Sequence, residues 1–190
     1  MKWLCCVKMS IYKRSCIAVA VLAFALGNIY SQGVLEGLYG MSLCSLPAAA
    51  NATQVEMPYV IAIDPGHGGM DTGAQGIVEE YTVIDTTAGF LYDLLASDDM
   101  FSPIMTRTDT DPDSTHRADV ANSANAHLVI SIHANSDSHH SSKGFECFPT
   151  PPGRPHHSSS LRFAQLTVEQ MEQSGHTIRG GEQKSGINYA

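Results

Sequence analysis

Two histidines and one glutamate are the residues of this chain best suited to bind a metal ion together. His67 follows a short apolar run and lies among glycines, Glu80 comes next, and His133 closes a later apolar run. Two imidazoles and one carboxylate are a standard ligand set for a catalytic zinc ion, whose fourth position stays open for water. Zinc lowers the pKa of that water toward ~7 and polarises a carbonyl group under attack, so the set predicts hydrolysis. A single histidine at a strand end is more often a structural residue than a metal ligand. Two such histidines, each beside small residues, support the structural and the metal-binding interpretation about equally.

The elements that would position these residues alternate between strand and helix. Hydrophobic spacing predicts strands over 59–63, 101–106, 127–133 and 144–148, and helices over 79–96, 114–125 and 158–175. This alternation is typical of an α/β fold, so we predict a single domain with a twisted, largely parallel sheet flanked by helices on both faces. Sites in such sheets lie where strands end. Both histidines lie at the ends of predicted strands, so one edge of the sheet could hold both.

The glycines around His67 have two possible meanings. Gly66, Gly68 and Gly69 would let the backbone turn sharply and let a substrate approach the metal. A glycine loop can also bind phosphate. This loop lacks the Lys-Ser/Thr ending of a P-loop and does not match the dinucleotide fingerprint, so we favour the metal site.

The remaining histidine pairs and the cysteine of the body have plain interpretations. His139 with His140 and His156 with His157 fall in polar stretches, and we expect them to be solvated. Cys147 is expected to be a small buried side chain.

The charge of the chain is unevenly distributed. Residues 1–50 contain four basic residues and one acid, a net charge of +3, which leaves seven basic and eighteen acidic residues, a net charge of −11, for 51–190. An acidic body argues against nucleic-acid binding, which needs a basic patch. It is compatible with binding a divalent cation.

The first fifty residues have the pattern of an export leader. Lys13 and Arg14 precede the apolar run Cys16–Leu26, whose 11 residues suit a secretory segment better than a full membrane span. Ala48–Ala50 are small residues of the kind that a signal peptidase accepts. We predict a leader over 1–50, with an uncleaved N-terminal anchor as the alternative, and a catalytic domain over 51–190.

Several segments together resemble a known family, the zinc-dependent N-acetylmuramoyl-L-alanine amidases (amidase type 3) of cell-wall hydrolases, sporulation enzymes and phage endolysins. They are Ile63-Asp64-Pro65-Gly66-His67-Gly68-Gly69-Met70-Asp71, Gly73-Ala74, Thr106-Arg107, Arg117, Ala121-Asn122, Ser131-Ile132-His133-Ala134-Asn135 and Gly144-Phe145-Glu146. Their order and spacing fit the family from about Val60 to the C-terminus. The resemblance implies a peptidoglycan hydrolase that cuts the amide between N-acetylmuramic acid and L-alanine of the stem peptide.

The resemblance also implies which residues hold the ion. Zinc would be bound by His67, His133 and an acid at Glu79 or Glu80, of which we prefer Glu80. The family's general-base glutamate lies near its C-terminal end, and residues 182–190 offer no match, so the catalytic residue is unknown here and expected beyond Ala190. Glu146 is expected to be a sheet position rather than the base.

Further expectations follow from the same resemblance. Asp64 would either orient a zinc ligand or serve as a turn residue, and Asn135 would contact substrate or cap its loop. We expect the last strands and a helix of the fold to be missing, and the chain to be weakly stable with little activity. We further expect a secreted or envelope-located monomer that binds peptidoglycan and no nucleic acid, and that meets the membrane only through an uncleaved leader. The alternative function is a zinc- and wall-binding module without turnover; a zinc hydrolase of another class is a third.

Overall fold

The computed structural model describes residues 3–9, 58–75, 78–107, 114–134, 143–179 and 186–189. Its elements, in chain order, are β1 (Trp3–Met9), β2 (Tyr59–Pro65), α2 (Glu80–Ala96), β3 (Phe101–Met105), α3 (Ser114–Ser123), β4 (Leu128–His133), β5 (Phe145–Pro149) and α4 (His157–Gln173). Every strand and helix predicted from hydrophobic spacing is present, and each end differs from the prediction by two residues at most.

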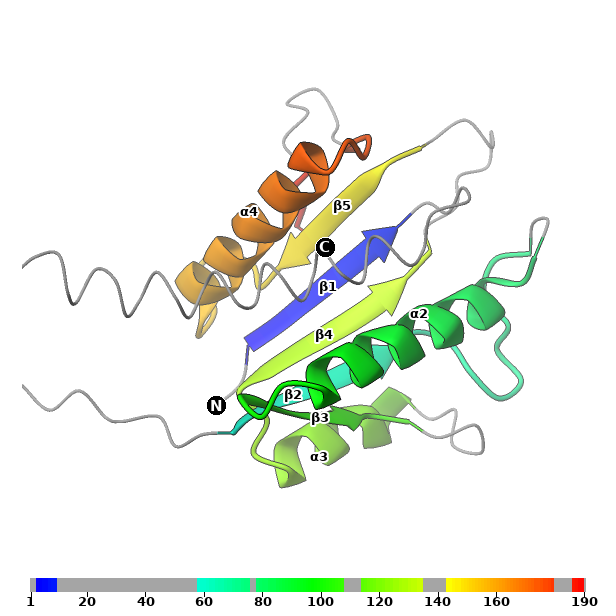
Figure 1. The fold of residues 1–190 in the computed structure, drawn as a ribbon, viewed down its shortest axis with the longest axis vertical. Coiled ribbons are helices and arrows are strands. Elements are labelled where there is room, and N and C mark those ends of the chain that lie inside the picture. Colours follow the sequence, from blue (N-terminus) through cyan, green and yellow to red (C-terminus); the bar gives the residue numbers. More distant parts are fainter. Residues whose placement is uncertain are drawn as a thin grey trace, which may run out of the picture.

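The described strands form one sheet in the order β3-β2-β4-β1-β5 (Figure 1). β2 pairs in parallel with both β3 and β4, and β4 pairs in parallel with β1. β5 alone runs antiparallel, against β1. The predicted α/β fold with a largely parallel sheet is therefore confirmed.

Helices cover both faces of the sheet. On one face α2 and α4 pack over the alternate strand residues that form the main core, among them Ile63, Ile130 and Cys147, all fully buried. Figure 1 shows α2 lying across β2 and α4 running beside β5. On the other face a smaller cluster joins Ala62 to Ala121 of α3. The two faces follow from the side chains of each strand pointing alternately to opposite sides.

β1 lies inside the segment for which the sequence predicts an export leader. Trp3–Met9 pairs with β4 on one side and with β5 on the other, so it is an inner strand of the sheet. Hydrophobic spacing did not predict a strand in this segment. The leader stays a prediction, and its apolar run Cys16–Leu26 lies outside the described residues. No helix in the described part of the chain has the length and apolar character needed to span a membrane.

Candidate metal centre

Two neighbouring parallel strands bring the two histidines to one edge of the sheet. His133 is the last residue of β4, and His67 follows the end of β2 by two residues. The register of these strands aligns Pro65 with Ile132, and the Gly66 amide donates to the carbonyl of Ile132 at 2.9 Å. The two imidazole rings lie 5.0 Å apart between centroids and almost perpendicular to each other.

Glu80 joins the two histidines from the first position of α2. Its Oε1 lies 3.2 Å from Nε2 of His67 and 3.7 Å from Nδ1 of His133. One ligand atom from each of the three residues lies within 4.8 Å of the others. Glu79 precedes the helix with an extended backbone and an exposed side chain, so it lies outside this group.

Backbone amides hold the Glu80 carboxylate in place. The Ala134 amide, directly after His133, donates to Oε1 at 2.8 Å, and the Ala74 amide donates to Oε2 at 3.0 Å. Glu80 is buried, with 8% of its surface exposed. Two charge-assisted hydrogen bonds offset part of the cost of burying this carboxylate.

Asp71 orients the His67 ring. Its Oδ2 lies 2.9 Å from Nδ1 of His67, and its Oδ1 accepts from the Gly73 amide at 3.0 Å. The hydrogen bond from His67, followed by that from Gly73, lowers the pKa of Asp71 below its ordinary value, so the carboxyl is ionised. A carboxylate only accepts, so Nδ1 of His67 is the donor in this hydrogen bond, and Nε2 is the ring nitrogen that faces Glu80 and can bind a cation.

This arrangement suits a cation. In the neutral ring, Nε2 of His67 and Oε1 of Glu80 would be two acceptors facing each other at 3.2 Å. Such a pair is stabilised only when a proton or a metal ion lies between them. The three side chains therefore fit a divalent ion both in donor type and in arrangement, and they leave a coordination position open.

Glycine is required at two positions around the group. A Cβ added to Gly66 would lie 2.4 Å from the His133 ring, and one added to Gly73 would lie 2.7 Å from the His67 ring. Gly73 also has a φ of +68°, which favours glycine. His67 itself has a φ of +61°, a conformation that non-glycine residues adopt only when their surroundings impose it.

Asp64 does not orient a ligand through any contact of the described residues. Its carboxylate accepts from the hydroxyls of Thr106 at 2.6 Å and Ser131 at 2.7 Å, and Arg117 lies 3.6 Å away. It therefore ties β2 to β4 and α3 behind the site. Asp71, four residues after His67, takes the orienting position, and its place in the glycine-rich motif is its one signal in the sequence.

Other residues named from the sequence lie away from the group. Glu146 is a buried residue of β5, paired with Arg179 at 3.2 Å, which agrees with a sheet position. Cys147 is a fully buried core residue, as expected. The expectation of a solvated His157 is wrong, because it begins α4, is half-buried and donates from Nδ1 to the Thr150 carbonyl at 2.6 Å. Asn135, His139 and His140 lie outside the described residues.

Comparisons with known proteins agree on one family. The family model described as N-acetylmuramoyl-L-alanine amidase matches residues 61–188. N-acetylmuramoyl-L-alanine amidase LytC of Bacillus subtilis (strain 168) is 35% identical over 116 residues, which cover 57% of this chain and 23% of the relative. N-acetylmuramoyl-L-alanine amidase CwlM of Bacillus licheniformis is 37% identical over 94 residues, 48% of this chain and 36% of the relative. The chain thus spans only a minor part of the length of these two relatives.

A solved structure is similar over most of the fold. The catalytic domain of CwlV, an N-acetylmuramoyl-L-alanine amidase from Bacillus (Paenibacillus) polymyxa var. colistinus, superposes with a TM-score of 0.57 at 29% sequence identity. The match covers 70% of each chain.

Proposed function

This chain belongs to the N-acetylmuramoyl-L-alanine amidase family, and on that premise we propose that it is a zinc-dependent hydrolase of peptidoglycan. Its substrate is the amide that joins the lactyl group of N-acetylmuramic acid to L-alanine of the stem peptide. The observation that carries the proposal is the meeting of His67, Glu80 and His133 within 4.8 Å. Zinc is the ion we propose because a His-Glu-His set with an open position is typical of catalytic zinc.

The described residues have distinct roles in this proposal. His67, Glu80 and His133 hold the ion, which when bound supplies Lewis acidity and a water of pKa about 7. Asp71 keeps the proton of His67 on Nδ1 and so presents Nε2 to the metal side. The amides of Ala74 and Ala134 keep the Glu80 carboxylate aimed between the two rings. We assign the general base to none of the described residues.

The substrate implies a location. Peptidoglycan lies outside the cytoplasmic membrane, so we propose that the chain acts in the cell envelope or in the medium. The leader predicted over residues 1–50 would direct this export. N-terminal sequencing of the protein from the envelope tests the leader: cleavage would give a start near Asn51 and remove β1, whereas an uncleaved anchor would retain Met1.

The activity is tested on isolated sacculi. The full chain is incubated with sacculi and zinc, and the products are examined by mass spectrometry and by labelling of new amino termini. We expect only slow release of stem peptides with a free N-terminal L-alanine, because none of the described residues supplies the general base, and loss of that release when zinc is removed by a chelator. Zinc binding without any release would instead support the non-catalytic module. Cleavage at a different bond would show a zinc hydrolase of another class.

A matched pair of variants tests the carboxylate. Glu80→Gln removes a buried ligand and should weaken zinc binding at least about 100-fold, because loss of a residue that only supports a ligand already costs 10–100-fold. Glu79→Gln changes an exposed neighbour and should leave zinc affinity within about twofold, as expected of a surface substitution. Equal effects of the two variants, measured by competition with a chromophoric chelator, would contradict the assignment.

A further inference from the structure

One buried arginine contacts the loop that carries His67. Arg107, just after β3, donates from Nε to the Pro65 carbonyl at 2.9 Å and from Nη2 to the Gly66 carbonyl at 3.2 Å. These are the two carbonyls directly before His67, whose backbone has the unusual φ of +61°. The hydrogen bonds from Arg107 therefore act where the loop must be held in a conformation it would not otherwise prefer.

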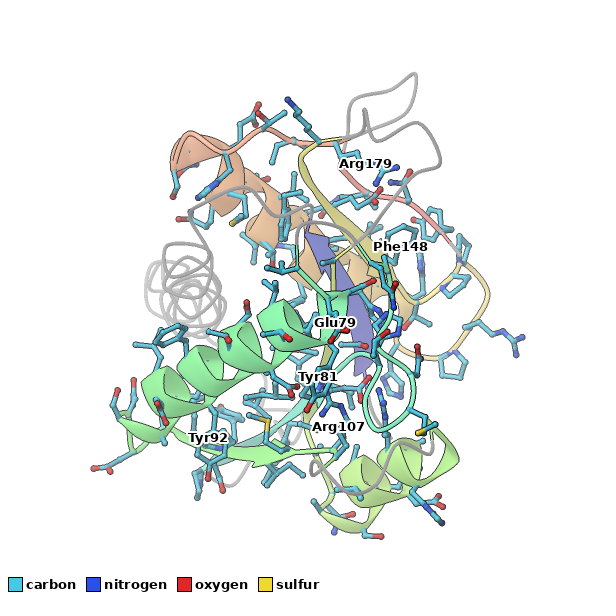
Figure 2. All side chains as sticks on the ribbon, turned by 90° about the vertical axis from the view of Figure 1, so that its right-hand side faces the viewer. Glu79, Tyr81, Tyr92, Arg107, Phe148 and Arg179 are labelled. Atoms are coloured by element: carbon cyan, nitrogen blue, oxygen red, sulfur yellow. The ribbon has the colours of Figure 1, made fainter. Side chains whose placement is uncertain are left out.

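The same guanidinium contacts the helix that carries Glu80. Nη2 of Arg107 lies 2.5 Å from Oδ1 of Asp85, and its Cζ lies 5.3 Å from the centre of the Tyr81 ring. Tyr81 and Asp85 both lie in the first two turns of α2, which begins at Glu80. Figure 2 shows Arg107 beside Tyr81, below the end of α2 at which Glu79 is labelled.

The burial of this arginine makes its contacts energetically important. Its side chain is only 3% exposed, whereas that of Asp85 is 30% exposed. A guanidinium out of water must have its donors satisfied, and a planar fork can satisfy acceptors on two elements at once. A lysine at this position has one nitrogen and could not hold both in the same geometry.

We infer that Arg107 is a positioning residue that fixes the His67 loop against the Glu80 helix and thereby sets the affinity of the metal centre. The inference rests on the proposed metal site for its functional consequence, but the clamp itself consists of contacts between protein groups alone. Arg107 bonds carbonyls on one ligand-bearing element and a carboxylate on the other, so it governs the separation of two ligands without touching either side chain.

Arg117 provides a matched comparison. This residue of α3 also donates to the loop, to the carbonyls of Pro65 at 2.9 Å and of His67, and it lies near Asp64. Among the described residues, its partners all belong to β2 and the following loop, and none lies on α2. The two arginines therefore share the loop and differ in their contact with the helix.

Hydrogen–deuterium exchange of the metal-free full chain tests the clamp. Uptake is measured by mass spectrometry over residues 64–74 and 79–86 and is normalised to α4, which reports general opening. We expect Arg107→Met to raise uptake in both segments and Arg117→Met to raise it in 64–74 alone. A pattern in which Arg107→Met changes one segment or neither, or in which the two variants behave alike, overturns the inference.

Zinc affinity gives a second test, which can still be made if Arg107→Met folds poorly. Asp85→Asn removes only the helix end of the clamp and should weaken zinc binding by about tenfold, the lower end of the range for residues that support ligands. In a Glu80→Gln background the same change should have no further effect, because the ligand it positions is gone. Equal losses in both backgrounds would show general destabilisation and overturn the inference. A wild-type chain that binds no zinc would count against the proposed function, whereas the exchange pattern decides the clamp on its own.

Discussion

Two regions of the molecule differ in the kind of side chains that they bury. In the first region, where β2 and β4 end beside the start of α2, Glu80, Arg107 and Asp64 form a polar cluster that is held by hydrogen bonds between elements. In the second region, β5 and α4 form a mostly apolar core around Phe163, with Glu146 and Arg179 as one ion pair. Figure 2 shows Arg107 and Arg179 well apart in these two regions. The difference teaches that the first region is built to orient groups and the second to stabilise the fold, and substitutions should separate the two.

The largest expected effect comes from removing a ligand. His133→Ala should lower the slow amidase activity of this chain to background, a loss of more than about 100-fold, because a group at the reacting centre is removed. The His133 side chain is 27% exposed, so the urea midpoint of the metal-free protein should change little. His116→Ala, at an exposed histidine of α3, is the control and should retain activity. If His133→Ala kept an activity within tenfold of wild type, His133 would not be needed at the site, and the first region would not have the role that the comparison gives it.

A core residue of the second region should give the largest change in stability. Phe163 is 1% exposed, so Phe163→Ala should cost about 3–5 kcal/mol of unfolding free energy. Phe90→Ala, at a side chain that is 44% exposed, should cost under about 1 kcal/mol by urea denaturation. Zinc bound per folded molecule should stay unchanged in both variants. Selective loss of zinc sites from the folded Phe163→Ala protein would show that the two regions are not separable.

Replacing the residue that orients His67 should change metal binding more than stability. Asp71→Asn places an amide donor opposite Nδ1 of His67 and favours the tautomer with the proton on Nε2. Zinc affinity should fall about 10–100-fold, the range for residues that support a metal-binding histidine. The Asp71 side chain is 67% exposed, so stability should change little. Asp93→Asn on the exposed face of α2 is the control, and equal affinities for the two variants would contradict the role of Asp71.

The smallest effect is expected from the ion pair of the second region. Arg179→Met removes the ion pair from the buried Glu146 carboxylate, which also accepts from the Asn188 amide at 2.9 Å. Because the Arg179 side chain is 25% exposed, solvent screens the pair and the cost should be about 1–2 kcal/mol. Arg154→Met, at an exposed arginine, is the control in the same urea experiment. A change in zinc affinity for Arg179→Met would mean that this region also orients the metal centre.

Local patterns were enough to predict most elements and the meeting of the two histidines. Hydrophobic spacing marked β2 and β4, and parallel neighbours place the ends of both strands at one edge. The choice between Glu79 and Glu80 stayed open because both lie at the start of α2. The first helical turn favours Glu80, because it buries Glu80 beside the histidines and leaves Glu79 exposed.

Contacts between residues far apart in the sequence could not be predicted. The partners of Arg107 lie 22 to 42 positions away in the sequence, and no local pattern indicates them. β1 was missed for a similar reason, because its pairing with β4 joins Trp3 to Leu128 and its composition resembled the start of a leader. The solvated interpretation of His157 failed because a polar neighbourhood in sequence says little about which carbonyl lies nearby in space.

The amides that bind Glu80 also bear on how fast an ion can enter and leave. The donors that hold the carboxylate belong to the chain itself, in the loops after both histidines. The conformational entropy of the Glu80 side chain is therefore lost when the chain folds and not when the ion binds. Association should then be limited by diffusion and by the loss of water from the ion, with no slow rearrangement of the chain, and differences in affinity between variants should arise mainly in how long the ion resides.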